Sequence, residues 1–76
     1  MQSREPQLIR HFVRSAQLRA DLLHDGYLVI SETALDAGRI ITFLRHQRNG
    51  RRLKLEISAE KTTLYEGTKI LKQLEG

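Results

Sequence analysis

The sequence has 76 residues, of which 13 are Lys or Arg and 9 are Asp or Glu, giving a formal net charge of +4 at pH 7. A chain of this length forms one small domain, residues 1–76, and buries only about 60% of its unfolded surface, so we expect a homodimer. The absence of cysteine excludes disulfides and cysteine-ligated zinc. The polar N-terminus shows no secretion signal and no apolar run is long enough to span a membrane, so we expect a cytoplasmic protein without a membrane partner.

Residues 6–24 have the apolar periodicity of an amphipathic helix. Apolar side chains recur at steps of three and four residues, which share one face of a helix. The predicted core positions are Leu8, Ile9, Phe12, Val13, Ala16, Ala20 and Leu23. Leu18 and Leu22 widen this apolar face, either for a broad core contact or for a dimer seam. Gly26 is a natural stop for the helix.

Residues 27–31 form a short, continuously apolar run after Gly26. Such a run is typical of a strand in the centre of a sheet and is too short for a helix. Residues 31–38 are then a connection. Thr33 and Asp36 have capping-box spacing, so the connection has room for a single helical turn.

Residues 39–58 form two alternating apolar runs on either side of Asn49-Gly50. This dipeptide strongly favours a tight β-hairpin, because both central residues of a type I′ turn need positive φ. A two-residue turn pairs Arg48 with Arg51 and makes one face of the hairpin almost wholly apolar. A slip by one residue would expose the aliphatic side chains of the second strand, so the hairpin faces are well specified.

After residue 58 the pattern weakens, and residues 59–66 fit a loop or a short edge strand equally well. From Thr68 a helical pattern returns, with Thr68 as the N-cap and Ile70, Leu71 and Leu74 on one side. The predicted fold is therefore α+β, in the order α-β-β-β-α, with a three-stranded antiparallel sheet packed by helices on one face.

The positive charge is concentrated on the predicted hairpin. Six Lys or Arg side chains lie between residues 39 and 54 without any acidic residue, and five of the six are Arg. Arginine suits phosphate because its planar fork binds two oxygens, and a two-stranded ribbon can enter a nucleic-acid groove. The candidate nucleic-acid-binding residues are Arg39, Arg45, Gln47, Arg48, Asn49, Arg51, Arg52 and Lys54. Gln47 and Asn49 could reach base edges.

Two other interpretations of the basic hairpin stay open. Its arginines would also dock on an acidic protein surface, as in an interaction module or an inhibitor. Alternatively, the charges only solubilise an exposed ribbon and protect its edge, although edge protection normally needs one or two lysines. We predict a small nucleic-acid-binding or regulatory protein, with RNA or DNA as the partner, and keep the acidic protein surface as the alternative.

No cofactor, metal site or catalytic residue is predicted. The three histidines, His11, His24 and His46, are too far apart in sequence to form a recognisable ligand motif, and we expect structural or surface roles for them. Tyr27 and Tyr65 could stack on bases as aromatic residues do in single-strand binders. Because aromatic residues are scarce in this chain, core or rim positions are expected for both tyrosines.

This chain resembles the second half of HicA-type toxins in two segments: Arg45-His46-Gln47-Arg48-Asn49-Gly50-Arg51-Arg52-Leu53 and Gly67-Thr68-Lys69-Ile70-Leu71-Lys72-Gln73-Leu74. These toxins are small RNA-cleaving proteins with a double-stranded-RNA-binding-like α-β-β-β-α fold. The resemblance implies this strand order, a closing helix over 67–74 and an RNA-binding face. The family's catalytic histidine has no counterpart here, since the corresponding place reads Gly38-Arg39-Ile40. RNA cleavage would require His46 to replace it.

Overall fold

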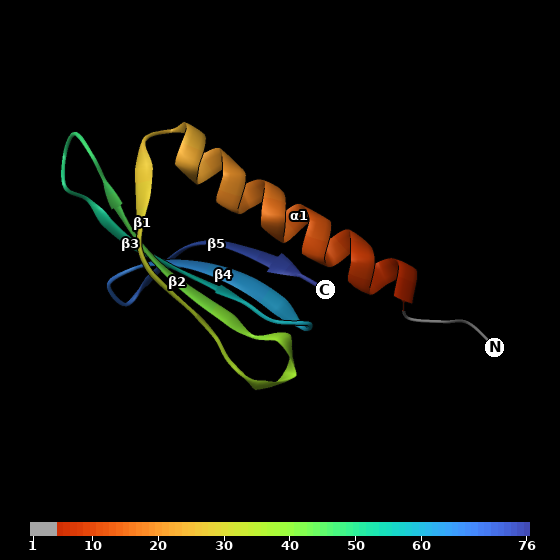
Figure 1. Cartoon of the computed structure of the whole chain (residues 1–76). Coiled ribbons are helices and arrows are strands. Elements are labelled where there is room, and N and C mark those ends of the chain that lie inside the picture. Colours follow the sequence, from red (N-terminus) through yellow and green to blue (C-terminus); the bar gives the residue numbers. More distant parts are fainter. Residues whose placement is uncertain (1–4) are drawn as a thin grey trace.

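The structure, a computed structural model, describes residues 5–76 as one helix and five strands (Figure 1). The elements in chain order are helix α1 (Glu5–His24), strand β1 (Tyr27–Ala34), the 3-10 turn η1 (Asp36–Gly38), and strands β2 (Ile40–His46), β3 (Arg52–Ile57), β4 (Lys61–Glu66) and β5 (Lys69–Glu75). The strands form one antiparallel sheet in the order β1-β2-β3-β4-β5. Each strand therefore pairs with its neighbours in sequence, which short turns can connect.

Helix α1 packs along one side of this sheet, and no helix of residues 5–76 packs on the other side (Figure 1). We call the side toward α1 the covered face and the opposite side the open face. Successive side chains of a strand point to opposite faces. In β3, for example, the buried residues Leu53, Leu55 and Ile57 belong to the covered face and alternate with more exposed polar residues of the open face.

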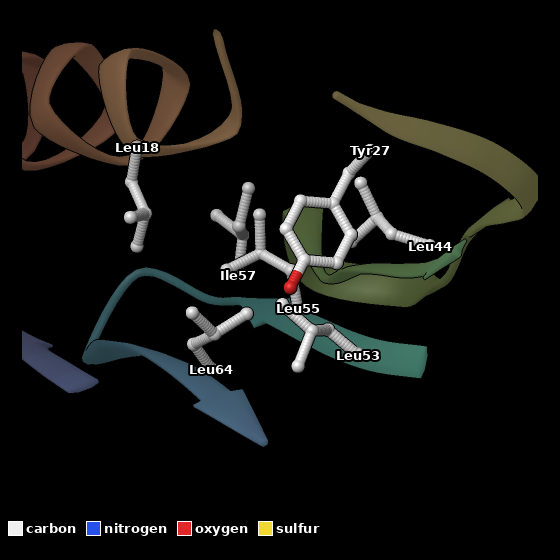
Figure 2. Close-up of a cluster of buried hydrophobic side chains, with 7 residues drawn as sticks. All are labelled: Leu18, Tyr27, Leu44, Leu53, Leu55, Ile57 and Leu64. Atoms are coloured by element: carbon white, nitrogen blue, oxygen red, sulfur yellow. The ribbon is translucent and has the colours of Figure 1, made fainter. Parts of the chain in front are cut away.

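The hydrophobic core lies between α1 and the covered face. Figure 2 shows its buried side chains, which come from α1 and from strands β1 to β4: Leu18, Tyr27, Leu44, Leu53, Leu55, Ile57 and Leu64. Each aliphatic side chain of this size contributes about 1.5 to 3 kcal/mol when it moves from water into such a core.

A buried polar cluster fixes the first half of α1 to the start of β4. Ser15 Oγ donates to the His11 carbonyl at 2.8 Å and lies 2.6 Å from Thr62 Oγ1. His11 Nε2 lies 2.7 Å from the Ser58 carbonyl oxygen, so this nitrogen carries the proton. His11 therefore has the structural role expected of it.

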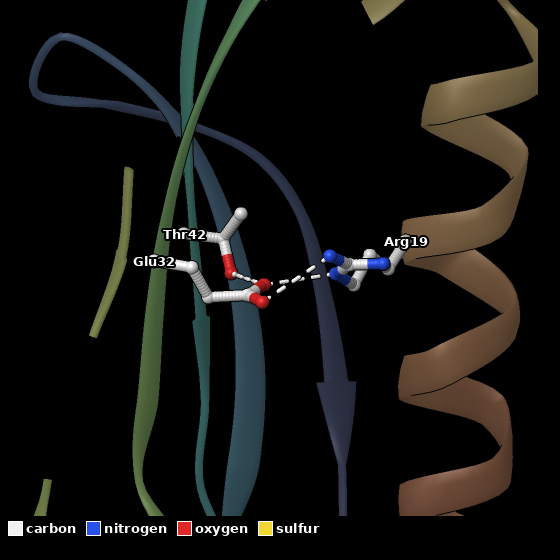
Figure 3. Close-up of polar contacts among 3 residues, drawn as sticks. All are labelled: Arg19, Glu32 and Thr42. Atoms are coloured by element: carbon white, nitrogen blue, oxygen red, sulfur yellow. Dashed lines mark hydrogen bonds and ion pairs between the residues drawn. The ribbon is translucent and has the colours of Figure 1, made fainter. Parts of the chain in front are cut away.

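A second polar contact fixes the other half of the helix to the sheet (Figure 3). The guanidinium of Arg19 donates to both carboxylate oxygens of Glu32, at 2.9 and 3.2 Å, and Thr42 Oγ1 donates to Glu32 Oε2 at 2.6 Å. These hydrogen bonds from Arg19 and then Thr42 hold the pKa of Glu32 below its ordinary value. The carboxylate is thus held between α1 and β2.

The predicted fold class is wrong in its number of strands and helices, although the class α+β holds. The sheet has five strands instead of three, and a single helix lies in the described residues. Residues 59–66, expected as a loop or an edge strand, contain β4, which is an inner strand between β3 and β5. The predicted C-terminal helix is strand β5, and this strand also replaces the closing helix that the resemblance to HicA-type toxins implies.

A β-bulge explains why β5 has the spacing of a helix. Lys72 pairs with Leu64 and Ile70 pairs with Tyr65, so Leu71 is an extra residue in the strand. Leu71 and Leu74 consequently both pack against the core, although residues three apart point to opposite faces of a regular strand. The irregular strand therefore imitates the three-residue step of a helix.

Strand β1 is an edge strand and not the predicted central one. It pairs only with β2, and its apolar residues Leu28, Val29 and Ile30 remain exposed. The strand continues to Ala34 through a bulge between Val29 and Ser31, so the expected helical turn begins later, at η1. A continuous apolar run thus marks an exposed edge here instead of a buried centre.

Helix α1 has the predicted extent but packs on the sheet through a different stripe. His11, Ser15 and Leu18 are buried, whereas Ile9 and Val13, two predicted core positions, are each 62% exposed. Ser15 can lie inside because it bonds to Thr62, and His11 because its Nε2 bonds to the Ser58 carbonyl, although His11 Nδ1 is buried without a hydrogen-bond partner within residues 5–76. The second apolar stripe of the helix, which we call the outer stripe, faces away from the sheet and consists of Ile9, Val13, Ala16, Ala20 and Leu23.

Candidate nucleic-acid interface

Strands β2 and β3 form the predicted hairpin with a longer loop than expected. Arg45 pairs with Arg52, and His46 closes the ladder by donating from its backbone N–H to the Arg51 carbonyl at 2.8 Å. Residues 47–50 form the loop, so the predicted pairing of Arg48 with Arg51 is wrong by two residues. A shift of two positions keeps every side chain on its predicted face, because the side-chain period of a strand is two.

Hydrogen bonds hold the hairpin loop in one shape. Asn49 Oδ1 accepts from the Arg51 backbone N–H at 2.8 Å, and the Gly50 N–H donates to the His46 carbonyl at 3.0 Å. The Gln47 N–H donates to the Gly26 carbonyl at 3.0 Å, which ties the loop to the end of α1. The side-chain oxygen of Asn49 is therefore used within the turn and is not available to a base.

The His46 ring completes this junction. Its Nε2 lies 2.9 Å from the Asp25 carbonyl, its Nδ1 lies 3.2 Å from the Arg48 backbone N–H, and its ring meets the Tyr27 ring edge-on at 4.8 Å. Gly26 has a φ of +109°, and a Cβ there would come within 2.8 Å of His46 Nε2. One ring nitrogen of His46 thus contacts the loop and the other contacts the end of α1, so the ring joins these two segments.

The eight candidate residues fall into four places. Arg45, Arg52 and Lys54 lie together on the open face, and Gln47, Arg48 and Asn49 lie in the loop. Arg39 precedes β2 at the far end of the hairpin, where it lines a small hollow together with Glu56 and Lys61. Arg51 is level with His46, whose side chain belongs to the covered face.

Arg51 is held by an acidic residue from another strand. Its Nε and Nη2 donate to the two carboxylate oxygens of Glu66 at 2.7 and 2.9 Å. The pair raises the pKa of Arg51 and lowers the pKa of Glu66, since each group stabilises the charged form of the other. One of the edges through which Arg51 could bind a phosphate with two hydrogen bonds is therefore already occupied.

Arg45 and Arg52 form an unfavourable pair on the open face. They are directly opposite each other in β2 and β3. Two like charges in such positions repel each other and destabilise the strand pair. Both are exposed, and within residues 5–76 neither has an acidic side chain at ion-pair distance. A bound anion between the two guanidiniums would relieve their repulsion.

The neighbouring row of the open face alternates aromatic and basic side chains. Phe43 on β2 is opposite Lys54 on β3, which is opposite Tyr65 on β4. Phe43 is 46% exposed, and Lys54 Nζ lies 4.7 Å from the centre of the Tyr65 ring, a cation–π contact. Lys54 Nζ also lies 3.9 Å from Glu56 Oε1. The open face therefore combines exposed aromatic area with cations.

The candidate residues predicted from the sequence do not include Phe43 or Tyr65. Residues 43 and 45 are two apart in β2 and therefore share a face, so the sequence could have identified Phe43 as a neighbour of Arg45. Tyr65 could be recognised only once β4 was known to lie beside β3. Of the two tyrosines considered for base stacking, Tyr27 is buried in the core and only Tyr65 reaches the open face.

Residues 5–76 bring no three His, Asp or Glu side chains together as a metal site would require. Within the same residues, no helix has the combination of length and apolar character needed to cross a bilayer. Comparisons with models of protein families, with curated proteins and with solved structures gave no match for this chain.

Proposed function

We propose that the protein binds nucleic acid through the open face and the loop of the β2–β3 hairpin. Arg45, Arg48 and Arg52 contact phosphates, with Lys54 beside them. The observation that carries the proposal is the pairing of Arg45 with Arg52, because two exposed arginines without acidic partners form a ready site for a phosphate. RNA and DNA are both available in the cytoplasm, the location that the proposal includes.

The rigid loop supports this function. The Gln47 N–H donates to the Gly26 carbonyl and the Arg48 N–H donates to His46 Nδ1, which positions Arg48 at the end of the hairpin before any ligand arrives. Preorganisation lowers the entropy lost on binding, so a few charged contacts yield more affinity than they would in a flexible loop. Gln47, exposed in the same loop, is the remaining candidate for a base contact.

The test is fluorescence anisotropy with labelled RNA and DNA over a salt series. Changing Arg45→Gln together with Arg52→Gln removes the site for one phosphate, so the slope of log K against log salt should fall by about 0.7 to 0.9. The control, Arg10→Gln with Arg14→Gln, makes the same change in net charge on an exposed side of α1. Equal effects of the two double variants would contradict the proposal.

An acidic protein surface is the alternative partner. It would give saturable binding to one protein, with no affinity for any nucleic acid at low salt. In that case the anisotropy experiment shows no binding for the unmodified protein, and the proposal fails.

The proposal includes a homodimer formed by the outer stripe of α1. The stripe has the four- and three-residue steps of a coiled-coil seam. Its β-branched residues, Ile9 and Val13, lie in the first half of the helix, and Ala16 and Ala20 lie in the second half, followed by Leu23 near the end. An antiparallel pair can therefore place Ile9 beside Ala20 of the partner subunit and Val13 beside Ala16 of the partner subunit, so a large side chain meets a small one in each layer.

A second copy suits this stripe better than an unrelated helix, because the large-to-small order is complementary to itself. Val13→Glu should convert the dimer into a folded monomer, which sedimentation equilibrium and circular dichroism can measure. Arg14→Glu, on the neighbouring exposed polar side, is the control and should leave the dimer intact. A monomeric unmodified protein at high concentration would contradict the dimer.

A further inference from the structure

We propose that the ligand of the open face is a single strand whose bases stack on Phe43 and Tyr65. This inference rests on the proposed function and specifies its class of nucleic acid. Three observations carry it: the width of the sheet, the exposure of Phe43, and the order of charged and aromatic rows.

The width of the sheet disfavours a duplex groove. The β2–β3 hairpin is not an isolated ribbon, because β1 flanks β2 as far as His46 and β4 flanks β3 at Lys54. Five strands about 4.8 Å apart span roughly 19 Å, whereas the major groove of B-DNA is about 12 Å wide. Only the loop extends beyond the flanking strands, so the open face itself must meet a ligand that lies across it.

The exposure of Phe43 needs a partner that offers a flat apolar surface. Phe43 lies on an inner strand, close to the middle of the face, and still has 46% of its surface in contact with solvent. Bases in a duplex stack on each other at 3.4 Å along each strand, which leaves no free base face for a side chain. An unpaired strand does offer base faces, and stacking on aromatic side chains is how such strands are commonly bound.

The rows of the open face separate phosphate contacts from base contacts. Arg45 and Arg52 form one row, and Phe43, Lys54 and Tyr65 form the next, two residues further along the strands. Adjacent rows on one face are about 7 Å apart. A strand with its phosphates on the arginine row therefore has its bases over the aromatic row.

The spacing within the aromatic row fits an extended strand. Phe43 and Tyr65 lie on β2 and β4, two strands apart and so roughly 10 Å from each other. Lys54 lies between them, where it can neutralise a phosphate or contact a base from its face. Neighbouring bases at the duplex rise of about 3.4 Å would not reach both rings.

The experiment compares a labelled 12-nucleotide oligouridine with a 12-base-pair RNA duplex and a 12-base-pair DNA duplex. The unmodified protein should bind the single strand most tightly. Phe43→Leu keeps the apolar character and removes the stacking surface, so it should weaken single-strand binding about 5- to 150-fold without changing the salt slope. Leu35→Ala, an exposed apolar residue of the β1–β2 connection, is the control and should bind normally.

A spectroscopic signal tests stacking directly. The sequence has no tryptophan, so Tyr65→Trp introduces a single reporter that keeps an aromatic ring at the site. Its fluorescence should be quenched when oligouridine binds, and Phe43→Leu in the same protein shows whether the two rings act together.

The outcomes separate this inference from the proposed function. If Phe43→Leu binds oligouridine as tightly as the unmodified protein while Arg45→Gln with Arg52→Gln does not, stacking is refuted and phosphate binding stands. Tighter binding of a duplex than of the single strand also refutes the inference alone. If no probe binds at low salt, both proposals fail.

Discussion

The two faces of the sheet come from the same strands but differ in the environment of their polar side chains. On the covered face, Thr42 and Thr62 are buried and hydrogen-bonded to Glu32 and Ser15. On the open face, Arg45 and Arg52 are opposite each other without acidic partners. Thr42 and Thr62 thus have their partners inside the protein, whereas Arg45 and Arg52 are exposed to solvent and free to meet an external anion.

The difference separates stability from function. Substitutions on the covered face should reduce the free energy of unfolding, because they remove packing or a hydrogen bond. Substitutions on the open face should change binding and leave the fold intact.

Leu55→Ala should produce the largest loss of stability. Leu55 is fully buried on β3, so its truncation removes apolar contacts and leaves a cavity, at a cost of about 2 to 5 kcal/mol. Phe43→Ala removes a larger side chain from the open face and should cost much less. Urea unfolding followed by circular dichroism measures both, and similar losses for the two variants would contradict the division of the sheet into two faces.

Thr62→Val should have the next largest effect. The change keeps the shape of the side chain but removes one of the two hydrogen bonds of the Ser15 hydroxyl, which keeps only the His11 carbonyl, and this should cost about 0.5 to 1.5 kcal/mol. Thr33→Val, an exposed substitution on β1, is the matched control and should be nearly neutral. A neutral Thr62→Val would show that the polar cluster does not stabilise the docking of α1.

Acid should weaken the fold through Glu32. Its pKa is lower in the folded protein than in the unfolded chain, so its contribution is fully present above the ordinary carboxyl pKa and is lost as the pH falls through the folded value. Because Glu32 is partly exposed, solvent screening limits this contribution to about 1 kcal/mol or less. Unfolding measured from pH 7 to pH 3 should show a smaller loss for Glu32→Gln than for the unmodified protein.

Glu66→Gln should have the smallest effect on stability and a measurable one on binding. The variant releases Arg51 from its ion pair and removes a negative charge near the loop. The midpoint of thermal unfolding should barely move, while anisotropy should show tighter binding of nucleic acid. Glu75→Gln makes the same charge change on β5 and is the control. Weaker binding by Glu66→Gln would mean that the ion pair positions the loop.

The parts of the fold that were predicted depend on local periodicity. The extent of α1 follows from its apolar steps and from Gly26, and the faces of β2 and β3 follow from strict alternation. The hairpin register was wrong by two residues, because Asn49 and His46 form hydrogen bonds that favour a longer loop. That error left the faces intact, so one face of the hairpin is apolar as predicted, and Arg45, Arg52 and Lys54 share the other.

The parts that were missed depend on contacts between distant residues. The inward stripe of α1 contains His11 and Ser15, whose partners Ser58 and Thr62 lie 47 positions later in the chain. Apolar periodicity alone therefore assigns the more apolar outer stripe to the core, although the structure leaves it exposed. Likewise, Arg51 could not be separated from the other arginines before β4 placed Glu66 beside it.

The most direct test of the account is a titration of ¹⁵N-labelled protein with oligouridine, followed by amide chemical shifts in NMR spectra. We expect the largest shifts at Phe43, Arg45, Arg52 and Lys54 and in the loop 47–50, with little change along α1. The largest shifts on the outer stripe of α1, with the open face unchanged, would contradict it.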